Sequence, residues 1–219
     1  MNFQNIDYVP ALRYRRLTRF YDAVLAVTMR EATFKSALLN QTELVPHQSI
    51  LDLGCGTATL TLSLKKQNPM LKIIGLDGDR QALSIAWTKA QRANVDIHFD
   101  EGFSFNLPYS DESFNHVFSS LLFHHLTYEN KKRTLEETYR VLKPSGVLHV
   151  ADWGKPRSAV MRGLFLLVQL LDGFKTTSDN VQGRIPNLFG QAGFKPVTET
   201  HYFNTLFGTL RLYQTTKPE

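Results

Sequence analysis

Short apolar runs alternate with amphipathic stretches through the middle of the chain. The runs at 50–54, 71–77, 95–102, 114–123 and 147–153 predict strands. Helical periodicity predicts helices over 58–67, 80–93 and 128–142, the last of which ends at the "KPSG" of 143–146. Strands that alternate with helices indicate βαβ units and a parallel sheet, and right-handed crossovers place helices on both of its faces.

The two ends of the chain depart from this alternation. Residues 11–39 have helical spacing, an apolar helix is expected near 157–173, and a short helix is expected from Pro186 to Gly193. Two strand-like runs, 194–203 and 205–216, predict an antiparallel hairpin at the sheet edge. We therefore expect one doubly wound α/β domain over 1–219. It comprises an N-terminal helical cap (1–45), a core (46–153), a helical lid or insert (154–193) and a C-terminal β-hairpin (194–219).

The composition indicates the class of protein but not its function. The 219 residues are 42% hydrophobic and 21% charged, which is typical of a globular protein with a sizeable core. A net charge of +5 permits an anionic ligand without requiring nucleic acid. Cys55 is the single cysteine, so no intrachain disulfide can form. The first residues lack a signal-peptide pattern, and the apolar run at 163–174 is too short for a membrane span, so a cytoplasmic location is expected.

A glycine turn between a strand and a helix is the main candidate binding site. In "SILDLGCGTATLTL" (49–62), Gly54 and Gly56 follow the predicted strand, where missing Cβ atoms let a ligand approach the backbone. The helix that follows offers free N–H groups. Asp77 ends the next strand about twenty residues on, as expected of a carboxylate that accepts hydrogen bonds from ribose hydroxyls. The pattern therefore predicts an adenosine-containing ligand.

The residues around the turn separate two classes of ligand. A dinucleotide fingerprint starting at Gly54 would have a third glycine where this chain has Thr59. Asp52 lies inside the motif, where a carboxylate disfavours a pyrophosphate and suits a cationic group such as an amino-acid ammonium. A tight turn without a ligand is the remaining alternative. We favour a ligand because Asp52, the glycines and Asp77 occur in register.

Four segments in order resemble the class I S-adenosylmethionine-dependent methyltransferases. They are "ILDLGCGTATL", "IIGLDGDRQALSIA", "EGFSFNLPYSDESFNHVFS" and "EETYRVLKPSGVLHVADW", and the resemblance covers roughly residues 45–153. Within that superfamily the chain resembles the small-molecule branch that includes ubiquinone/menaquinone-biosynthesis-type enzymes. The resemblance implies a mostly parallel, seven-stranded, Rossmann-like sheet with an antiparallel last strand, S-adenosyl-L-methionine as cofactor and S-adenosyl-L-homocysteine as product.

The resemblance also implies roles for individual residues. The methionine end of the cofactor would lie against Asp52, Gly54, Cys55 and Gly56 and the backbone around Ser119 to Leu121, and Asp77 would hold the ribose with Gly78 against the adenine. Phe103 and Ser104 would contact the adenine edge, although relatives usually carry an acidic or amide side chain where this chain has Phe103. Tyr21, in the N-terminal helical segment, could donate to the methionine carboxylate.

His124 and His125 are the candidate catalytic residues. They follow the fourth strand of the core, at the sheet edge where the methyl group is expected, and an imidazole has a suitable intrinsic pKa for a general base. Alternatively, one of them shapes the turn by bonding to backbone. No third ligand lies at a useful spacing in the sequence, so no metal site is predicted.

The favoured function is methyl transfer to a small, partly apolar acceptor by in-line displacement. A nicotinamide-dependent oxidoreductase shares Gly54, Gly56 and Asp77 but is disfavoured by Thr59. A non-catalytic binder of S-adenosylmethionine is suggested only by Phe103. A nucleic-acid methyltransferase would favour an "NPPY"-like tetrapeptide where this chain has "SSLL" (119–122). We expect a small-molecule substrate, no nucleic acid partner, no membrane span and a possible homodimer.

Overall fold

A computed structural model describes residues 31–219 of the chain. Helix α2 (Glu31–Leu39) is the part of the predicted 11–39 helix that falls in this range. Most of the predicted N-terminal cap, with Tyr21, lies outside the described residues. Among residues 31–219, no helix is both long enough and apolar enough to cross a membrane.

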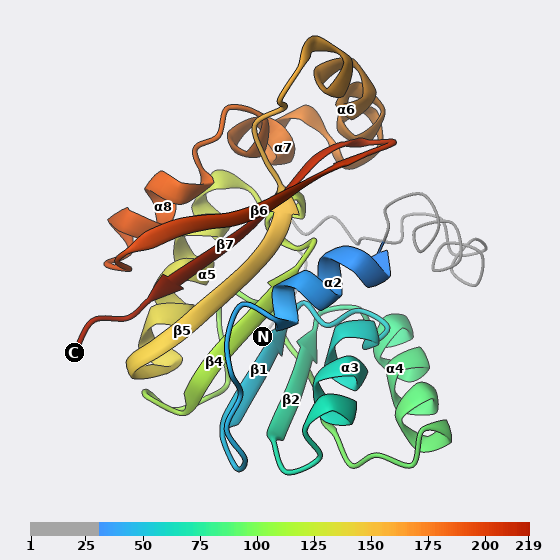
Figure 1. The fold of residues 1–219 in the computed structure, drawn as a ribbon, viewed down its shortest axis with the longest axis vertical. Coiled ribbons are helices and arrows are strands. Elements are labelled where there is room, and N and C mark those ends of the chain that lie inside the picture. Colours follow the sequence, from blue (N-terminus) through green and yellow to red (C-terminus); the bar gives the residue numbers. More distant parts are fainter. Residues whose placement is uncertain (1–30) are drawn as a thin grey trace, which may run out of the picture.

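Seven strands form one sheet in the order β3-β2-β1-β4-β5-β7-β6 (Figure 1). Their bounds are β1 (Ser49–Leu53), β2 (Lys72–Asp77), β3 (His98–Glu101), β4 (Phe114–Ser120), β5 (Leu142–Trp153), β6 (Val197–Thr205) and β7 (Gly208–Thr216). The pairings among β1 to β5 are parallel, and β7 runs antiparallel to both β5 and β6. The predicted doubly wound sheet with an antiparallel last strand is confirmed.

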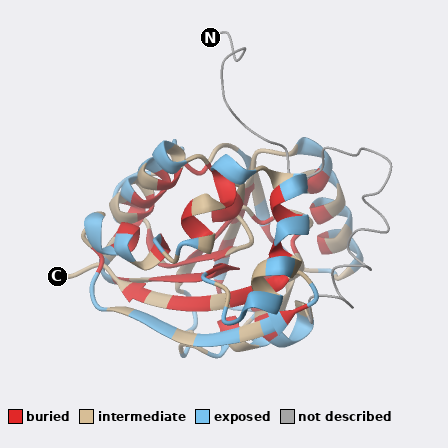
Figure 2. Cartoon of the chain, turned by 90° about the horizontal axis from the view of Figure 1, so that it is seen from above, coloured by how far each residue is buried: buried red, intermediate tan, exposed pale blue. Residues whose placement is uncertain are grey.

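Helices cover both faces of the sheet. Their bounds are α3 (Thr59–Gln67), α4 (Arg80–Arg92), the 3-10 turn η1 (Phe123–His125), α5 (Tyr128–Val141), α6 (Ala159–Asp172), α7 (Phe174–Val181) and α8 (Ile185–Gln191). Figure 1 shows α6 and α7 beyond the arrowhead of β5, with α5 and α8 on the opposite side of the sheet from α2. Figure 2 shows buried residues gathered on the strands and on the inward sides of the helices.

Strand alternation divides the core into two clusters. In β1, Leu51 and Leu53 pack with α5 and α8, whereas Ile50 packs with α2 and α3. In β4, Val117 and Phe118 divide in the same way. Side chains on a strand point alternately to opposite faces, so strands buried on both faces are apolar along their whole length.

Three elements differ from the sequence prediction. β5 begins directly after α5, at Leu142, because Leu142 pairs with Phe114 before an irregularity in the β4 pairing. β4 ends at Ser120, and the residues predicted to extend it to 123 lead into η1 instead. Helix α7 was not predicted, because its buried residues are polar: Thr176, Thr177, Asp179 and Asn180.

Candidate functional site

The glycine turn lies where β1 ends, beside the ends of β2 and β4. The backbone N–H groups of Gly54 and Cys55 both donate to the carbonyl oxygen of Leu76, at 2.8 and 3.0 Å, which ties the turn to β2. Gly54 and Gly56 have positive φ angles of 73° and 54°. A Cβ added at Gly54 would lie 3.0 Å from Cδ1 of Leu122, whereas one added at Gly56 would meet nothing within 4 Å. The turn is therefore packed at Gly54 and open at Gly56.

Asp77 is fixed by the backbone on either side of it. Its Oδ2 accepts from the N–H of Gly56 at 2.8 Å and its Oδ1 accepts from the N–H of Asp79 at 2.8 Å. Burial raises the pKa of this carboxyl above its ordinary value, and the two backbone hydrogen bonds oppose that rise. Gly78 lies half-buried in the same turn. This carboxylate is held at the mouth of the glycine turn, where a carboxylate oxygen retains capacity to accept from a ligand.

The side chains of Asp52 and Cys55 are buried at the glycine turn. Asp52 is 1% exposed, and its Oδ2 accepts from the hydroxyl of Thr61 at 2.6 Å. Burial raises the pKa of Asp52 from 3.8 to about 6, although the Thr61 bond and the charge of Lys35 oppose the rise. Burial also raises the pKa of the Cys55 thiol, with a smaller contribution from Asp52. A buried carboxylate with a raised pKa is stabilised by any cation placed beside it.

The predicted adenine-edge residues differ in where their side chains lie. Phe103 is half-buried and stacks on Phe105, with ring centroids 5.3 Å apart. The Ser104 hydroxyl is buried 2.9 Å from the hydroxyl of Thr134 on α5, so this side chain contacts the helix. The Ser104 side chain is therefore held by α5, and the Phe103 ring packs on Phe105.

Ser119 and Leu121 mark the end of β4. The Ser119 hydroxyl donates to the carbonyl oxygen of Leu53 at 3.0 Å and is fully buried, so it joins β4 to β1. Leu121 has a φ of 59°, and its N–H donates to the carbonyl oxygen of Ala151 on β5. This left-handed residue turns the chain away from the sheet and into η1.

The two candidate catalytic histidines lie side by side on η1. Nδ1 of His124 donates to Oδ1 of Asp152 at 2.8 Å, and the ring centroids of His124 and His125 are 4.0 Å apart. Burial alone would lower the pKa of His124, but Asp152, through its charge and hydrogen bond, and Asp172, through its charge, outweigh burial and raise it. Burial and the neighbouring His124 lower the pKa of His125. The two imidazoles therefore differ in pKa: that of His124 is raised and that of His125 is lowered.

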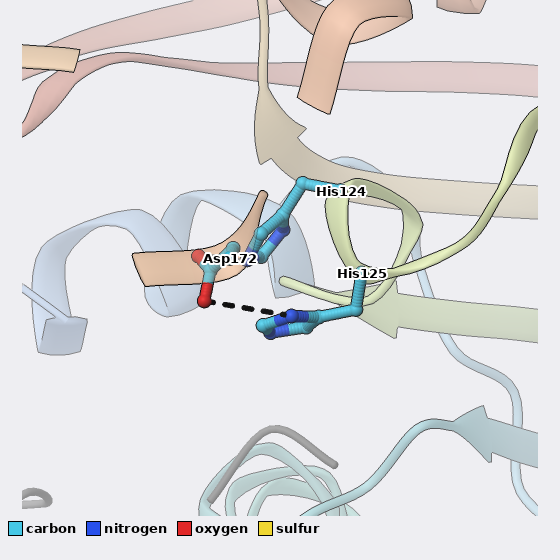
Figure 3. A group of neighbouring side chains, drawn as sticks. All are labelled: His124, His125 and Asp172. Atoms are coloured by element: carbon cyan, nitrogen blue, oxygen red, sulfur yellow. Dashed lines mark ion pairs between the residues drawn. The ribbon is translucent and has the colours of Figure 1, made fainter. Parts of the chain in front are cut away.

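A third polar side chain, which the sequence did not single out, completes this group. Asp172, at the end of α6, places Oδ2 at 3.7 Å from Nε2 of His124 and Oδ1 at 3.8 Å from Nδ1 of His125. Figure 3 shows its carboxylate facing both rings. Spacing along the sequence predicts no metal site, and folding brings this third potential ligand from a distant helix. No pattern around Asp172 distinguishes it from other helix-terminal acids.

Comparisons with known proteins agree with the fold and the motifs. A family model described as a methyltransferase domain matches residues 50–146. A demethylmenaquinone methyltransferase of Lactobacillus johnsonii is 32% identical over 170 residues, which cover 68% of this chain and 69% of the relative. One of Chlorobaculum parvum is 31% identical over 186 residues, covering 77% and 73%. A ubiquinone/menaquinone biosynthesis C-methyltransferase of Blochmanniella floridana is 30% identical and covers 60% and 52%.

Solved structures share the fold at low sequence identity. The YcgJ protein of Bacillus subtilis has a TM-score of 0.70 at 17% identity, covering 84% of this chain and 98% of that one. A phosphoethanolamine N-methyltransferase of Haemonchus contortus, in complex with S-adenosylhomocysteine, has a TM-score of 0.71 at 14% identity and covers 85% and 53%. These likenesses concern the fold alone.

Proposed function

The chain belongs to the class I S-adenosylmethionine-dependent methyltransferases, and we propose that its acceptor is a ring carbon of a small hydroquinone. The oxidoreductase alternative is not favoured, since the relatives reported above are methyltransferases. Two of those relatives are named for demethylmenaquinone, a quinone, and a third is named a C-methyltransferase. The name of the first two relatives supports a hydroquinone acceptor, and the name of the third supports transfer to a ring carbon.

The residues at the carboxyl ends of β1 and β2 fit S-adenosylmethionine. The observation that carries this assignment is the open side of Gly56 directly beside the fixed carboxylate of Asp77. Asp77 binds the ribose hydroxyls, and Gly56 lets the ligand lie against the main chain. Asp52 supplies negative charge below the turn for the cationic amino-acid end. The Phe103 ring packs on the adenine, whose amino group is left to backbone acceptors.

When bound, S-adenosylmethionine supplies a methyl group already activated by its sulfonium. The protein therefore has to place the acceptor carbon in line and exclude water. Asp172, His124 and His125 lie where β4 and β5 end, and the ring of His124 lies edge-on to the buried ring of Trp153. A hydroquinone placed there directs a hydroxyl at the polar group. Loss of that hydroxyl proton makes the neighbouring ring carbon nucleophilic.

Carbon methylation predicts which acceptors react. The full-length protein, given S-adenosylmethionine with a tritiated methyl group, should label 1,4-naphthohydroquinone kept under reductant. It should not label the matched 2,3-dimethyl compound, whose two adjacent ring carbons are blocked. Label in both compounds would indicate transfer to oxygen and contradict the carbon. No label in any hydroquinone, with transfer to an amine or thiol in the same assay, would contradict the acceptor class.

A variant pair tests the acceptor end separately from the cofactor end. His124→Gln should lower kcat and leave the affinity for S-adenosylhomocysteine unchanged, because His124 lies at the acceptor. His98→Gln is the matched control, since His98 is an exposed histidine paired with Asp100 on β3. Equal kcat for His124→Gln and His98→Gln would contradict the role of His124. The homodimer stays a prediction.

A further inference from the structure

Three side chains with metal-binding atoms converge beside the end of β5. They are His124 and His125 on η1 and Asp172 on α6 (Figure 3). Each offers one ligand atom, and these atoms all lie within 4.8 Å of one another. We propose that they bind one divalent transition-metal ion and leave a coordination position open to an oxygen of the acceptor. Binding of the ion does not depend on the proposed function. Only the binding of an acceptor oxygen at the open coordination position rests on it.

The distances in this group suit a shared ion better than hydrogen bonds. The gaps from Asp172 to the two imidazole nitrogens, 3.7 and 3.8 Å, exceed the range of about 2.7–3.2 Å in which N–H···O hydrogen bonds form. A tetrahedral zinc ion with bonds of about 2.0–2.1 Å holds neighbouring ligand atoms roughly 3.4 Å apart. The ligand atoms lie within 4.8 Å of one another, so they move closer together when an ion of that geometry binds between them.

The hydrogen-bond partner of His124 orients its Nε2 as a metal ligand. The hydrogen bond from Nδ1 to Asp152 fixes the proton on that nitrogen and turns Nε2 toward Asp172. Asp152 is itself fully buried and accepts from the backbone N–H groups of Phe123 at 2.6 Å and of Trp153 at 2.7 Å. Histidine ligands of metals are commonly oriented by a carboxylate on the other ring nitrogen. The arrangement is the one that a metal-bound histidine requires.

His125 supplies an independent observation. Its Nδ1 is buried and has no hydrogen-bond partner among residues 31–219. An unsatisfied buried polar atom loses its hydrogen bonds to water without replacement, so such atoms are rare in folded proteins. The nearest carboxylate oxygen to this nitrogen is that of Asp172, at a distance suited to a shared ion. A metal bound between them satisfies this nitrogen.

The donor set selects the class of ion. Two imidazoles and one carboxylate favour zinc and neighbouring first-row metals, whereas magnesium and calcium favour oxygen ligands. Three protein ligands leave at least one position open, as in catalytic zinc sites. An ionised hydroquinone oxygen in that position is stabilised by the ion, which would promote release of the hydroxyl proton to water before the carbon is methylated.

Metal binding can be measured without any methyl transfer. The full-length protein, stripped with a chelator and dialysed, is titrated with Co²⁺ and followed by visible d–d absorption and by calorimetry with Zn²⁺. We expect one ion per chain. Asp172→Asn and His125→Gln should each weaken binding at least tenfold, and His98→Gln, which removes an exposed His–Asp pair, should not change it. Binding that is absent, or equal in all of these proteins, would overturn the site. Circular dichroism confirms that each variant is folded.

The open position has its own readout. Adding 1,4-naphthohydroquinone to the Co²⁺-loaded protein should shift the d–d bands, and the fully methylated ether, which has no ionisable hydroxyl, should not. An unchanged spectrum would overturn the open position while leaving the ion site standing. Calorimetry with S-adenosylhomocysteine should give the same affinity in the stripped and loaded proteins. Absence of S-adenosylhomocysteine binding in both the stripped and the loaded protein would refute the proposed cofactor site and leave the metal measurement unaffected.

Discussion

Replacing Asp52 by asparagine is expected to stabilise the protein at neutral pH and to weaken its binding of S-adenosylhomocysteine. Asp52 is almost completely buried, and burial raises its pKa from 3.8 to about 6. The folded protein thus holds an ionised carboxylate at neutral pH at a cost in stability. Such a cost is understandable where the charge binds a cationic ligand.

The sign of the effect follows from proton linkage. Between about pH 4 and pH 6 the folded protein keeps a proton that the unfolded chain has lost, so stability falls as pH rises through this window. A shift of roughly two pKa units corresponds to about 3 kcal/mol, present in full above pH 6. Because asparagine cannot ionise, the unfolding free energy of Asp52→Asn relative to the unsubstituted protein should rise by about 2–3 kcal/mol between about pH 4 and pH 7.

Guanidinium denaturation of both proteins at several pH values across this window measures the difference directly. Asp96→Asn is the matched control, because Asp96 is an exposed carboxylate whose substitution should change stability by less than about 0.5 kcal/mol. If the difference in unfolding free energy between Asp52→Asn and the unsubstituted protein does not vary with pH, the reasoning is refuted. Unchanged affinity for S-adenosylhomocysteine would refute the role assigned to the charge.

Three further substitutions test separate parts of the account. Asp77→Asn should weaken S-adenosylhomocysteine binding by about 1.5–3 kcal/mol, measured by calorimetry, and unchanged affinity would contradict ribose binding. Gly56→Ala should cost about 1–2 kcal/mol of stability from its left-handed backbone but more than tenfold in ligand affinity, because its Cβ fills the open side of the turn. Lys131→Met should cost about 1–3 kcal/mol in denaturant unfolding, since buried Asp179 loses its 3.2 Å partner and keeps the longer 3.6 Å pair with Arg184; a cost below about 0.5 kcal/mol would contradict that pairing.

The sheet and the glycine turn could be predicted because their signals are local. Strands buried on both faces leave apolar runs, and a left-handed turn at a strand end leaves glycines such as Gly54 and Gly56. Asp77 was found by its distance from that turn along the chain. The antiparallel edge could be predicted from the two strand-like runs at 194–203 and 205–216, which form β6 and β7.

The missed features depend on contacts between distant residues. The buried residues of α7 are threonines, an asparagine and an aspartate. Asp179 accepts from the Nζ of Lys131 on α5, and Asn180 donates to the carbonyl oxygen of Trp153 on β5. A helix whose buried residues are polar leaves no apolar periodicity. The place of Asp172 beside His124 depends on how α6 returns to the end of β5, and no spacing in the sequence encodes that distance.

The hydroxyls of Ser104 and Ser119 show how far a motif can assign a role. Both residues lie in the segments that resemble the family motifs, yet their side chains bond to Thr134 and to the carbonyl oxygen of Leu53. Motif position locates the backbone of a binding segment. It does not determine which way a small polar side chain turns, because that depends on the partner the fold supplies.

The central claim is that the turn at Gly54–Gly56 and Asp77 binds the adenosyl and amino-acid parts of S-adenosylmethionine. The most direct test is calorimetric titration of the full-length protein with S-adenosylhomocysteine, with NADH titrated under the same conditions. The expected result is micromolar binding of S-adenosylhomocysteine, weakened more than tenfold in Gly56→Ala, and no heat of binding from NADH. Binding of NADH, or no binding of S-adenosylhomocysteine by the folded protein, would contradict it.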